Sequence, residues 1–230
     1  MLAVIVLFDR FTALDAVGPY EVLSSLPGAE VVFAAQTPGP VVNEKGTLHL
    51  MADAALADVP RPDVIVISGG PGQNAHMADE ALLGWLRAAD SRSAWTTSVC
   101  TGSLLLAAAG LLRGRRAACH WAWRELLADF GVTPDPARIV RDGNIVTGGG
   151  VTAGIDMALA VMAQIAGVDY AETVQLALEY SPEPPFDSGR PERARPEIVA
   201  AALRRLDGIR VERSAAVGRA ADRTLKALPA

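Results

Sequence analysis

Hydrophobic residues occur along this chain in short unbroken runs that are separated by longer amphipathic stretches. Residues 2–8, 63–68 and 94–99 form three such runs, dominated by apolar and β-branched side chains. Runs of this kind are typical of parallel strands that are covered on both faces. Residues 13–26 and 73–89 have helical patterns and follow the first two runs. This alternation predicts an α/β fold with a mostly parallel central sheet.

The rest of the chain continues the alternation, and we expect one domain over residues 1–230. It is expected to be a three-layer α/β sandwich of flavodoxin-like type, with about 186–230 as a C-terminal extension packed on it. The further expected elements are strands at 29–35 and 117–121, hairpins at 41–51 and 138–147, helices at 104–109, 122–130, 155–166, 169–180 and from about 196, and an extended segment at 181–186.

Composition restricts the classes of function. Half of the 230 residues are hydrophobic, 20% are charged, and the net charge is −5, so we expect a large core and no nucleic-acid partner. The apolar N-terminus meets Asp9 and Arg10 too early for a signal peptide or a membrane span. Two cysteines make no disulfide framework, which favours the cytoplasm. The three histidines and two cysteines lack metal-ligand spacing, and phosphate-binding glycine motifs are absent.

Cys100 is the main candidate for chemistry. It stands between the strand at 94–99 and the helix at 104–109, with small Ser98 and Gly102 two residues away on either side. Small neighbours allow a sharp strand-to-helix turn that presents the middle side chain above the sheet. The start of the following helix would favour a thiolate and depress its pKa, making Cys100 a nucleophile. The alternative is an inert cysteine buried under the sheet.

Three further positions could surround that cysteine. Asp15 follows the first strand, where it is either a helix cap or a carboxylate at the site. Gly69 and Gly70 follow the strand at 63–68 and form either a plain turn or a loop of backbone N–H donors for an oxyanion. His120 is either a core histidine or part of the pocket wall.

Taken together, these residues resemble the ThiJ/PfpI family of the class-I glutamine amidotransferase-like superfamily, and within it the branch that hydrates isocyanides. The resemblance covers nearly the whole chain. Its motifs are Leu14-Asp15-Ala16-Val17-Gly18-Pro19, Thr97-Ser98-Val99-Cys100-Thr101-Gly102-Ser103, His120-Trp121-Ala122, Val140-Arg141-Asp142-Gly143-Asn144, Thr147-Gly148-Gly149-Gly150 and Pro184-Pro185-Phe186.

The resemblance implies Cys100 as nucleophile and Asp15 as general acid and base, with the backbone N–H groups of Gly70 and Thr101 as donors. It also implies a homodimer, a small-molecule isocyanide as substrate and no cofactor. Many hydrolases of the superfamily carry histidine directly after the cysteine, whereas this chain has Thr101. That difference argues against a protease or amidase mechanism.

Three alternatives remain within the same family. One is a glyoxalase- or deglycase-like enzyme for α-oxoaldehydes, which would also use a cysteine and a carboxylate. Another is a redox sensor in which Cys100 is oxidised to the sulfinic acid. The third is the sensor half of a transcription regulator. About 45 residues follow Pro185, which we expect to be too few for the paired helix-turn-helix domain of such regulators.

Overall fold

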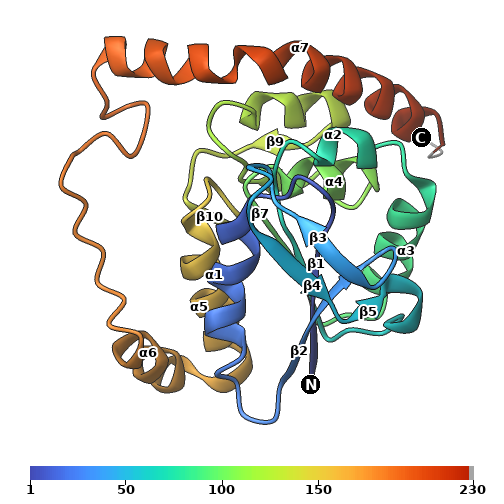
Figure 1. The fold of residues 1–230 in the computed structure, drawn as a ribbon, viewed down its shortest axis with the longest axis vertical. Helices are drawn as coiled ribbons and strands as arrows, with labels where there is room; N and C mark the ends of the chain where they lie inside the picture. Colours follow the sequence, from blue (N-terminus) through green and yellow to red (C-terminus); the bar gives the residue numbers. More distant parts are fainter. Residues whose placement is uncertain (228–230) are drawn as a thin grey trace.

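The computed structural model describes residues 1–227 and shows a sheet between two layers of helices (Figure 1). The predicted α/β sandwich is therefore confirmed. The strands are β1 Leu2–Val6, β2 Glu30–Ala35, β3 Gly39–Val42, β4 His49–Ala52, β5 Ala54–Ala55, β6 Val64–Ile67, β7 Trp95–Val99, β8 Arg116–Ala117, β9 Thr133–Pro134, β10 Ile139–Asp142 and β11 Ile145–Gly148. The helices are α1 Ala13–Leu23, α2 Gln73–His76, α3 Glu80–Asp90, α4 Gly102–Ala108, α5 Ala153–Ala166, α6 Val168–Ala177 and α7 Pro196–Ala227, with 3-10 turns η1 Leu56–Asp58 and η2 Arg124–Phe130.

The central sheet has the strand order β10-β11-β7-β6-β1-β2-β5, and only β10 is antiparallel to its neighbour. In the middle of the sheet, Ile67 pairs with Val6 on one side and Ser98 on the other. The carboxyl ends of β1, β6 and β7 therefore lie at one edge. Parallel α/β sheets bind ligands at this edge.

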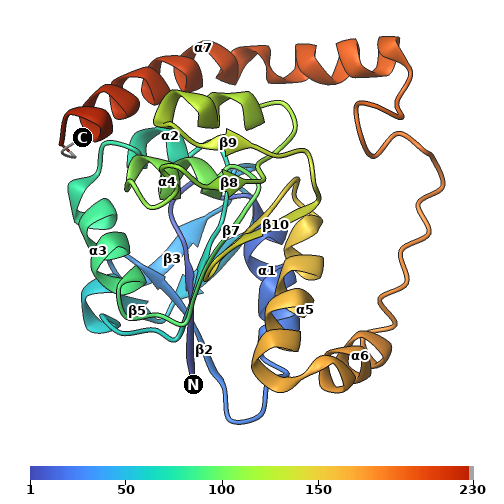
Figure 2. The same cartoon turned by 180° about the vertical axis from the view of Figure 1, so that it is seen from behind.

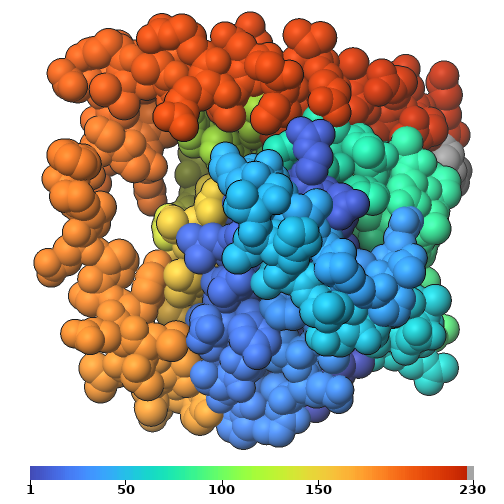
Figure 3. Space-filling view, viewed as in Figure 1, coloured from blue at the N-terminus to red at the C-terminus, as the bar shows by residue number. Residues whose placement is uncertain are grey.

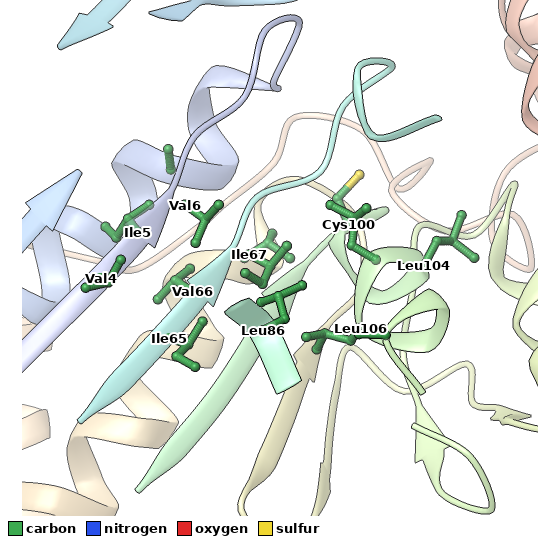
Figure 4. Packing of buried hydrophobic residues seen from close by; sticks show 14 of the residues in the cluster. Val4, Ile5, Val6, Ile65, Val66, Ile67, Leu86, Cys100, Leu104 and Leu106 are labelled. Atoms are coloured by element: carbon green, nitrogen blue, oxygen red, sulfur yellow. The ribbon is translucent and has the colours of Figure 1, made fainter. Parts of the chain in front are cut away.

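The strand side chains form an apolar core in which Val4, Ile5, Ile65 and Ile67 are fully buried. Figure 4 shows these side chains packed along β1 and β6, with the sulfur of Cys100 beyond the end of β7. Burial of several large aliphatic side chains, at about 1.5–3 kcal/mol each, fixes the strand register. The register in turn fixes the position of the Cys100 turn.

Helices α1 and α5 pack together on one face of the sheet, and α3 and α4 lie on the other (Figures 1 and 2). The close approach of α1 and α5 depends on glycine: a Cβ on Gly154 would lie 3.2 Å from the ring of Pro19 and 3.1 Å from Val99. Pro19 lies inside α1. It leaves the Asp15 carbonyl without its usual helical donor.

The C-terminal part of the chain has two unlike segments. Residues 181–195 form an arm without helix or strand. Figure 3 shows a gap between the arm and the body, whereas residues 189–192 border a cavity together with Trp121 and Arg124 of the body. Helix α7 then crosses the molecule and contacts α2, α4 and η2. Its buried side chains include Val217, Ala220 and Ala221. This contact brings a remote part of the sequence to the carboxyl edge of the sheet. Among the described residues, no helix is both long and apolar enough to cross a membrane.

Three of the expected elements are wrong in detail. The helix expected over 122–130 is the 3-10 turn η2, which begins at Arg124 after a turn at 121–123. The helix expected over 73–89 is two helices, α2 and α3, because Asp79 accepts hydrogen bonds from the N–H groups of Ala81 and Leu82 and caps a new helix. The strand expected over 117–121 stops after Ala117, and the next residues turn. His120 therefore lies in a turn.

The turn at Cys100 is packed tightly around Gly102, at the start of α4, and a substitution there tests this packing. A Cβ there would lie 2.3 Å from the carbonyl oxygen of Ile67, a backbone atom that cannot rotate away. We expect Gly102→Ala to lower the free energy of unfolding by about 1–3 kcal/mol in urea denaturation. The control is Gly84→Ala in α3, where the nearest atom is 3.8 Å away. It should raise stability by up to about 1 kcal/mol, and equal effects of the two changes would contradict this packing.

Candidate active site

Cys100 occupies the strand-to-helix turn predicted for it. Its φ angle is +58°, a left-handed conformation that is strained for a residue with a side chain. The turn is held by hydrogen bonds from the Cys100 N–H to the carbonyls of Gly149 (2.7 Å) and Gly148 (3.2 Å), and from the His120 N–H to the Cys100 carbonyl (3.4 Å). These contacts hold the strained backbone in place. Strain of this kind is characteristic of functional sites.

Asp15 lies in the first turn of α1 and is completely buried. Its Oδ2 accepts a hydrogen bond from the Gly69 N–H at 2.8 Å. Its Oδ1 is buried and has no hydrogen-bond partner among residues 1–227. An unsatisfied buried carboxylate is costly, and a proton removes most of that cost. A side chain with this burial cannot be a solvated loop acid, and the role of Asp15 at the site stays a prediction.

Burial raises the pKa of Asp15 to about 8. The hydrogen bond from Gly69 and the neighbouring Cys100 side chain act in the opposite direction, and the negative charge of Glu44 adds to the rise. At neutral pH the carboxyl group consequently holds a proton. A group in this state can act as a general acid.

The expected depression of the Cys100 pKa is wrong. The thiol is 5% exposed, and burial raises its pKa, with further increases from Asp15 and Cys119. The Thr101 N–H and the Arg213 guanidinium lower it, but they do not overcome burial. Helix α4 has only seven residues, so its dipole is a weak source of stabilisation. A Cys100 thiolate would therefore have to form by proton transfer to a partner group and not by release of the proton to solvent at neutral pH.

The glycine loop contacts Asp15 and Thr101, the residue that follows Cys100. A Cβ on Gly69 would lie 2.7 Å from Asp15 Oδ2 and 2.6 Å from the Thr101 nitrogen, so only glycine fits between them. The Gly70 N–H already donates to the Thr101 hydroxyl oxygen at 3.0 Å. To act as an oxyanion donor, the Gly70 N–H would have to break its hydrogen bond to the Thr101 hydroxyl oxygen and donate to the substrate instead. The donor roles of Gly70 and Thr101 stay predictions.

His120 borders the same cavity as Cys100. Its Nδ1 accepts a hydrogen bond from the Ala122 N–H at 3.3 Å, which places the ring proton on Nε2. Burial and the nearby Arg213 lower the pKa of His120 to about 4, so the ring is neutral at physiological pH. The ring therefore forms part of the wall without contributing charge.

The cavity above Cys100 has a volume of about 280 Å³. Its floor includes Cys100 and Thr101, and α7 contributes Leu206, Ile209 and Arg213 to its lining. The contribution of α7 was missed in the sequence. The spacing of residues 213, 216, 217, 220 and 224 could have revealed it, because these positions lie on one face of a helix and all are buried. An arginine inside such a stripe is unusual.

No group of three or more potential metal-ligating side chains is found within residues 1–227. Both cysteines in that range are free and buried. The cavity lining offers the Cys100 thiol, backbone N–H groups and the charged side chains of Glu44, Lys45, Arg205 and Arg213, and the Asp15 carboxyl group lies beside the thiol.

Comparison with known proteins agrees with this geometry. The model of the DJ-1/PfpI family matches residues 1–164. The chain belongs to the DJ-1/PfpI family. The predicted ThiJ/PfpI resemblance is thereby confirmed. The solved structure of a ThiJ/PfpI family protein from Pseudomonas syringae has a TM-score of 0.90 and 36% identity, covering 94% of this chain and 90% of that one.

Within the DJ-1/PfpI family, one curated relative is similar over most of the chain. Isonitrile hydratase of Pseudomonas putida is 47% identical over 199 residues, which is 86% of this chain and 87% of the relative. The transcriptional regulator CdhR of Pseudomonas aeruginosa is 35% identical over 140 residues, which cover only 40% of that protein. Oxidised DJ-1 of Toxoplasma gondii has a TM-score of 0.69 at 23% identity, covering 79% of this chain and 99% of that one, and shares the fold.

The raised pKa of Asp15 predicts how stability depends on pH. Between the ordinary value of 3.8 and about 8, the folded protein holds a proton that the unfolded chain releases. The stability contributed by this group is complete below that window and is lost as pH rises through it. The free energy of unfolding of the wild type, relative to Asp15→Asn, should therefore fall steadily from about pH 5 to pH 8.

Urea denaturation of both proteins at several pH values measures this difference. Asparagine keeps an acceptor for the Gly69 N–H but cannot ionise, so groups elsewhere cancel in the comparison. A difference that stays constant or rises with pH would show that Asp15 is an ordinary carboxylate.

Proposed function

We propose that this protein hydrates an organic isocyanide to an N-substituted formamide without a cofactor. The observation that carries the proposal is the 47% identity to an isonitrile hydratase over nearly the full length of both chains. The geometry supports it, because the Cys100 thiol lines the cavity and the buried, neutral Asp15 carboxyl group lies beside that thiol. Addition of a nucleophile and a proton to one carbon requires these two groups.

In the first step, the Cys100 sulfur attacks the terminal carbon of the isocyanide and forms a carbon–sulfur bond. The same carbon takes a proton from the Asp15 carboxyl group, while the thiol proton passes to the carboxylate that is left. The product is a thioimidate, in which all atoms of thiol and isocyanide are retained. The elevated pKa of Asp15 keeps the proton available at neutral pH.

In the second step, a water molecule adds to the thioimidate carbon. Its oxygen bonds to that carbon, one hydrogen goes to the substrate nitrogen, and the other returns to sulfur through Asp15. The carbon–sulfur bond then breaks and releases the formamide and the free thiol. In this mechanism Asp15 Oδ1, which has no hydrogen-bond partner among the described residues, would relay these protons.

The apolar part of the cavity lining suits a compact apolar substrate group, although the lining also includes charged Glu44, Lys45, Arg205 and Arg213. Leu206, Ile209 and Val151 contribute apolar wall, and Trp123 adds an aromatic face. A cavity of about 280 Å³ is small, so we infer a substrate of modest size. The backbone N–H of Thr101, which faces the Cys100 sulfur, would stabilise the thiolate as it leaves.

Replacing each cysteine tests the nucleophile. We expect Cys100→Ala to abolish formamide production from an aryl or cyclohexyl isocyanide, because no other thiol lines this cavity among the described residues. The matched control is Cys119→Ala, which removes a second free, buried cysteine and should retain activity.

Asp15→Asn should lower kcat by about 10²–10⁴, because the general acid is removed. Product is measured by chromatography, with folding checked by circular dichroism.

The same proteins distinguish the alternative activities. Turnover of methylglyoxal but not of isocyanide would replace the proposal with a glyoxalase-like activity. No turnover of either, with Cys100 converted to the sulfinic acid by mild peroxide, would indicate a redox sensor. Full hydration by Cys100→Ala would refute the thioimidate mechanism.

We also propose that two copies associate through α6 and the arm at 181–195. Large apolar side chains there face solvent, including Leu176 at 81% and Phe186 at 76% exposure. Such exposed apolar groups indicate an interaction surface. The gap between arm and body leaves room for another chain (Figure 3).

Sedimentation equilibrium tests the homodimer. The wild type should have twice the chain mass of 24.1 kDa, and Leu176→Glu with Phe186→Glu should shift it toward monomer. Val211→Glu on α7 is the control, because Val211 is similarly exposed (77%) but lies outside the arm. A monomeric wild type would contradict the proposal.

A further inference from the structure

Arg213 is a buried charge with no carboxylate partner. It lies on α7, is 3% exposed, and forms no ion pair among the described residues. Each side-chain carboxylate or arginine taken out of water costs several kcal/mol unless it is compensated. A buried arginine without an acidic partner therefore calls for another source of stabilisation, and its surroundings identify one.

Three contacts fix the guanidinium in one orientation. Its Nε donates to Asn74 Oδ1 at 2.9 Å, and its Nη2 donates to the Gly70 carbonyl at 3.2 Å. Its central carbon lies 4.5 Å from the centre of the Trp123 ring, in a cation–π contact. The remaining nitrogen, Nη1, has no hydrogen-bond partner within residues 1–227. All of these contacts are to neutral groups.

The guanidinium lines the same cavity as Cys100. The charged and titratable groups that face Cys100 come from several elements: Asp15 from α1, Cys119 and His120 from the turn after β8, and Arg213 from α7. Glu44 and Lys45, from the β3–β4 connection, and Arg205 line the wider cavity. Asp15 and Cys119 disfavour a thiolate, and His120 is neutral. Arg213 is therefore the buried cation that acts on the sulfur.

We propose that Arg213 is a positioning residue for the reaction: from α7 it stabilises the Cys100 thiolate that forms in the cavity. This rests on the proposed function for its catalytic consequence, although the effect on the thiol is independent of substrate. The thiolate, when it forms, is in turn the missing counter-charge of Arg213. Each of the two groups thus reduces the cost of burying the other.

The proposal assigns a role to the contact between α7 and the body. The thiolate appears when Cys100 transfers its proton toward Asp15, and again when the carbon–sulfur bond breaks. The guanidinium stabilises both states without transferring a proton, and it lowers the pKa of the Cys100 thiol against the effect of burial. The apolar Leu206 and Ile209 on the same helix close the cavity. Helix α7 therefore completes the site.

The rate at which iodoacetamide alkylates Cys100, followed by mass spectrometry of its peptide, tests this without any isocyanide. Arg213→Gln keeps polar side-chain donors and removes the charge. We expect the apparent pKa of alkylation to rise by about one unit or more, which lowers the rate at a fixed lower pH about tenfold. Arg213→Lys should stay close to the wild type. The control is Arg204→Met, which removes an exposed arginine of α7 and should change nothing.

The hydration assay, run on the same proteins, separates the two proposals. An upward shift in alkylation pKa with a matching loss of kcat supports both. A shift without any isocyanide turnover in the wild type supports the role of Arg213 and overturns the proposed function. An unchanged pH profile in folded Arg213→Gln overturns the role of Arg213. If that variant does not fold, Asn74→Asp replaces it, because a carboxylate beside Nε would neutralise the guanidinium and should raise the apparent pKa of alkylation. An unchanged profile in this variant overturns the proposal equally.

Discussion

The site depends on burying two acidic groups, Cys100 and Asp15, against each other at the carboxyl edge of the sheet. Burial raises both pKa values, so the pair keeps its protons at neutral pH. A buried carboxyl group with an oxygen that lacks a partner is unfavourable for stability. It is nevertheless suited to moving a proton between sulfur and a substrate carbon. Under the proposed mechanism, both Cys100 and Asp15 are therefore protonated before substrate binds, and no thiolate is formed in advance.

The rest of the fold maintains this arrangement. Register between β1, β6 and β7 aligns the three strand ends, and Gly69 lets the Asp15 and Thr101 groups approach each other. The strained Cys100 backbone is held by the carbonyls of Gly148 and Gly149. Helix α7 then covers the edge and adds a cation. Elements from almost every part of the sequence thus meet at one sulfur atom.

Much of this was predictable from the sequence, because unbroken apolar runs and small residues around Cys100 are local signals. The mostly parallel sheet and the turn at Cys100 follow from them. The order of the strands does not, and the sequence left Asp15 open between a helix cap and a carboxylate at the site. The direction of the Cys100 pKa shift was predicted wrongly, because desolvation depends on how completely other segments cover the sulfur. The role of Arg213 also required the structure, because its contacts with Gly70 and Asn74 span about 140 residues of sequence.

The protonation state of Asp15 tests the central claim most directly. Carbon-13 NMR of protein labelled at the aspartate carboxyl carbons, with the Asp15 signal assigned by its loss in Asp15→Asn, gives the pKa of this one group. We predict that the signal stays at the position of a protonated acid through neutral pH and titrates near 8. A signal that is fully ionised by about pH 6, as for an ordinary aspartate, would contradict the account.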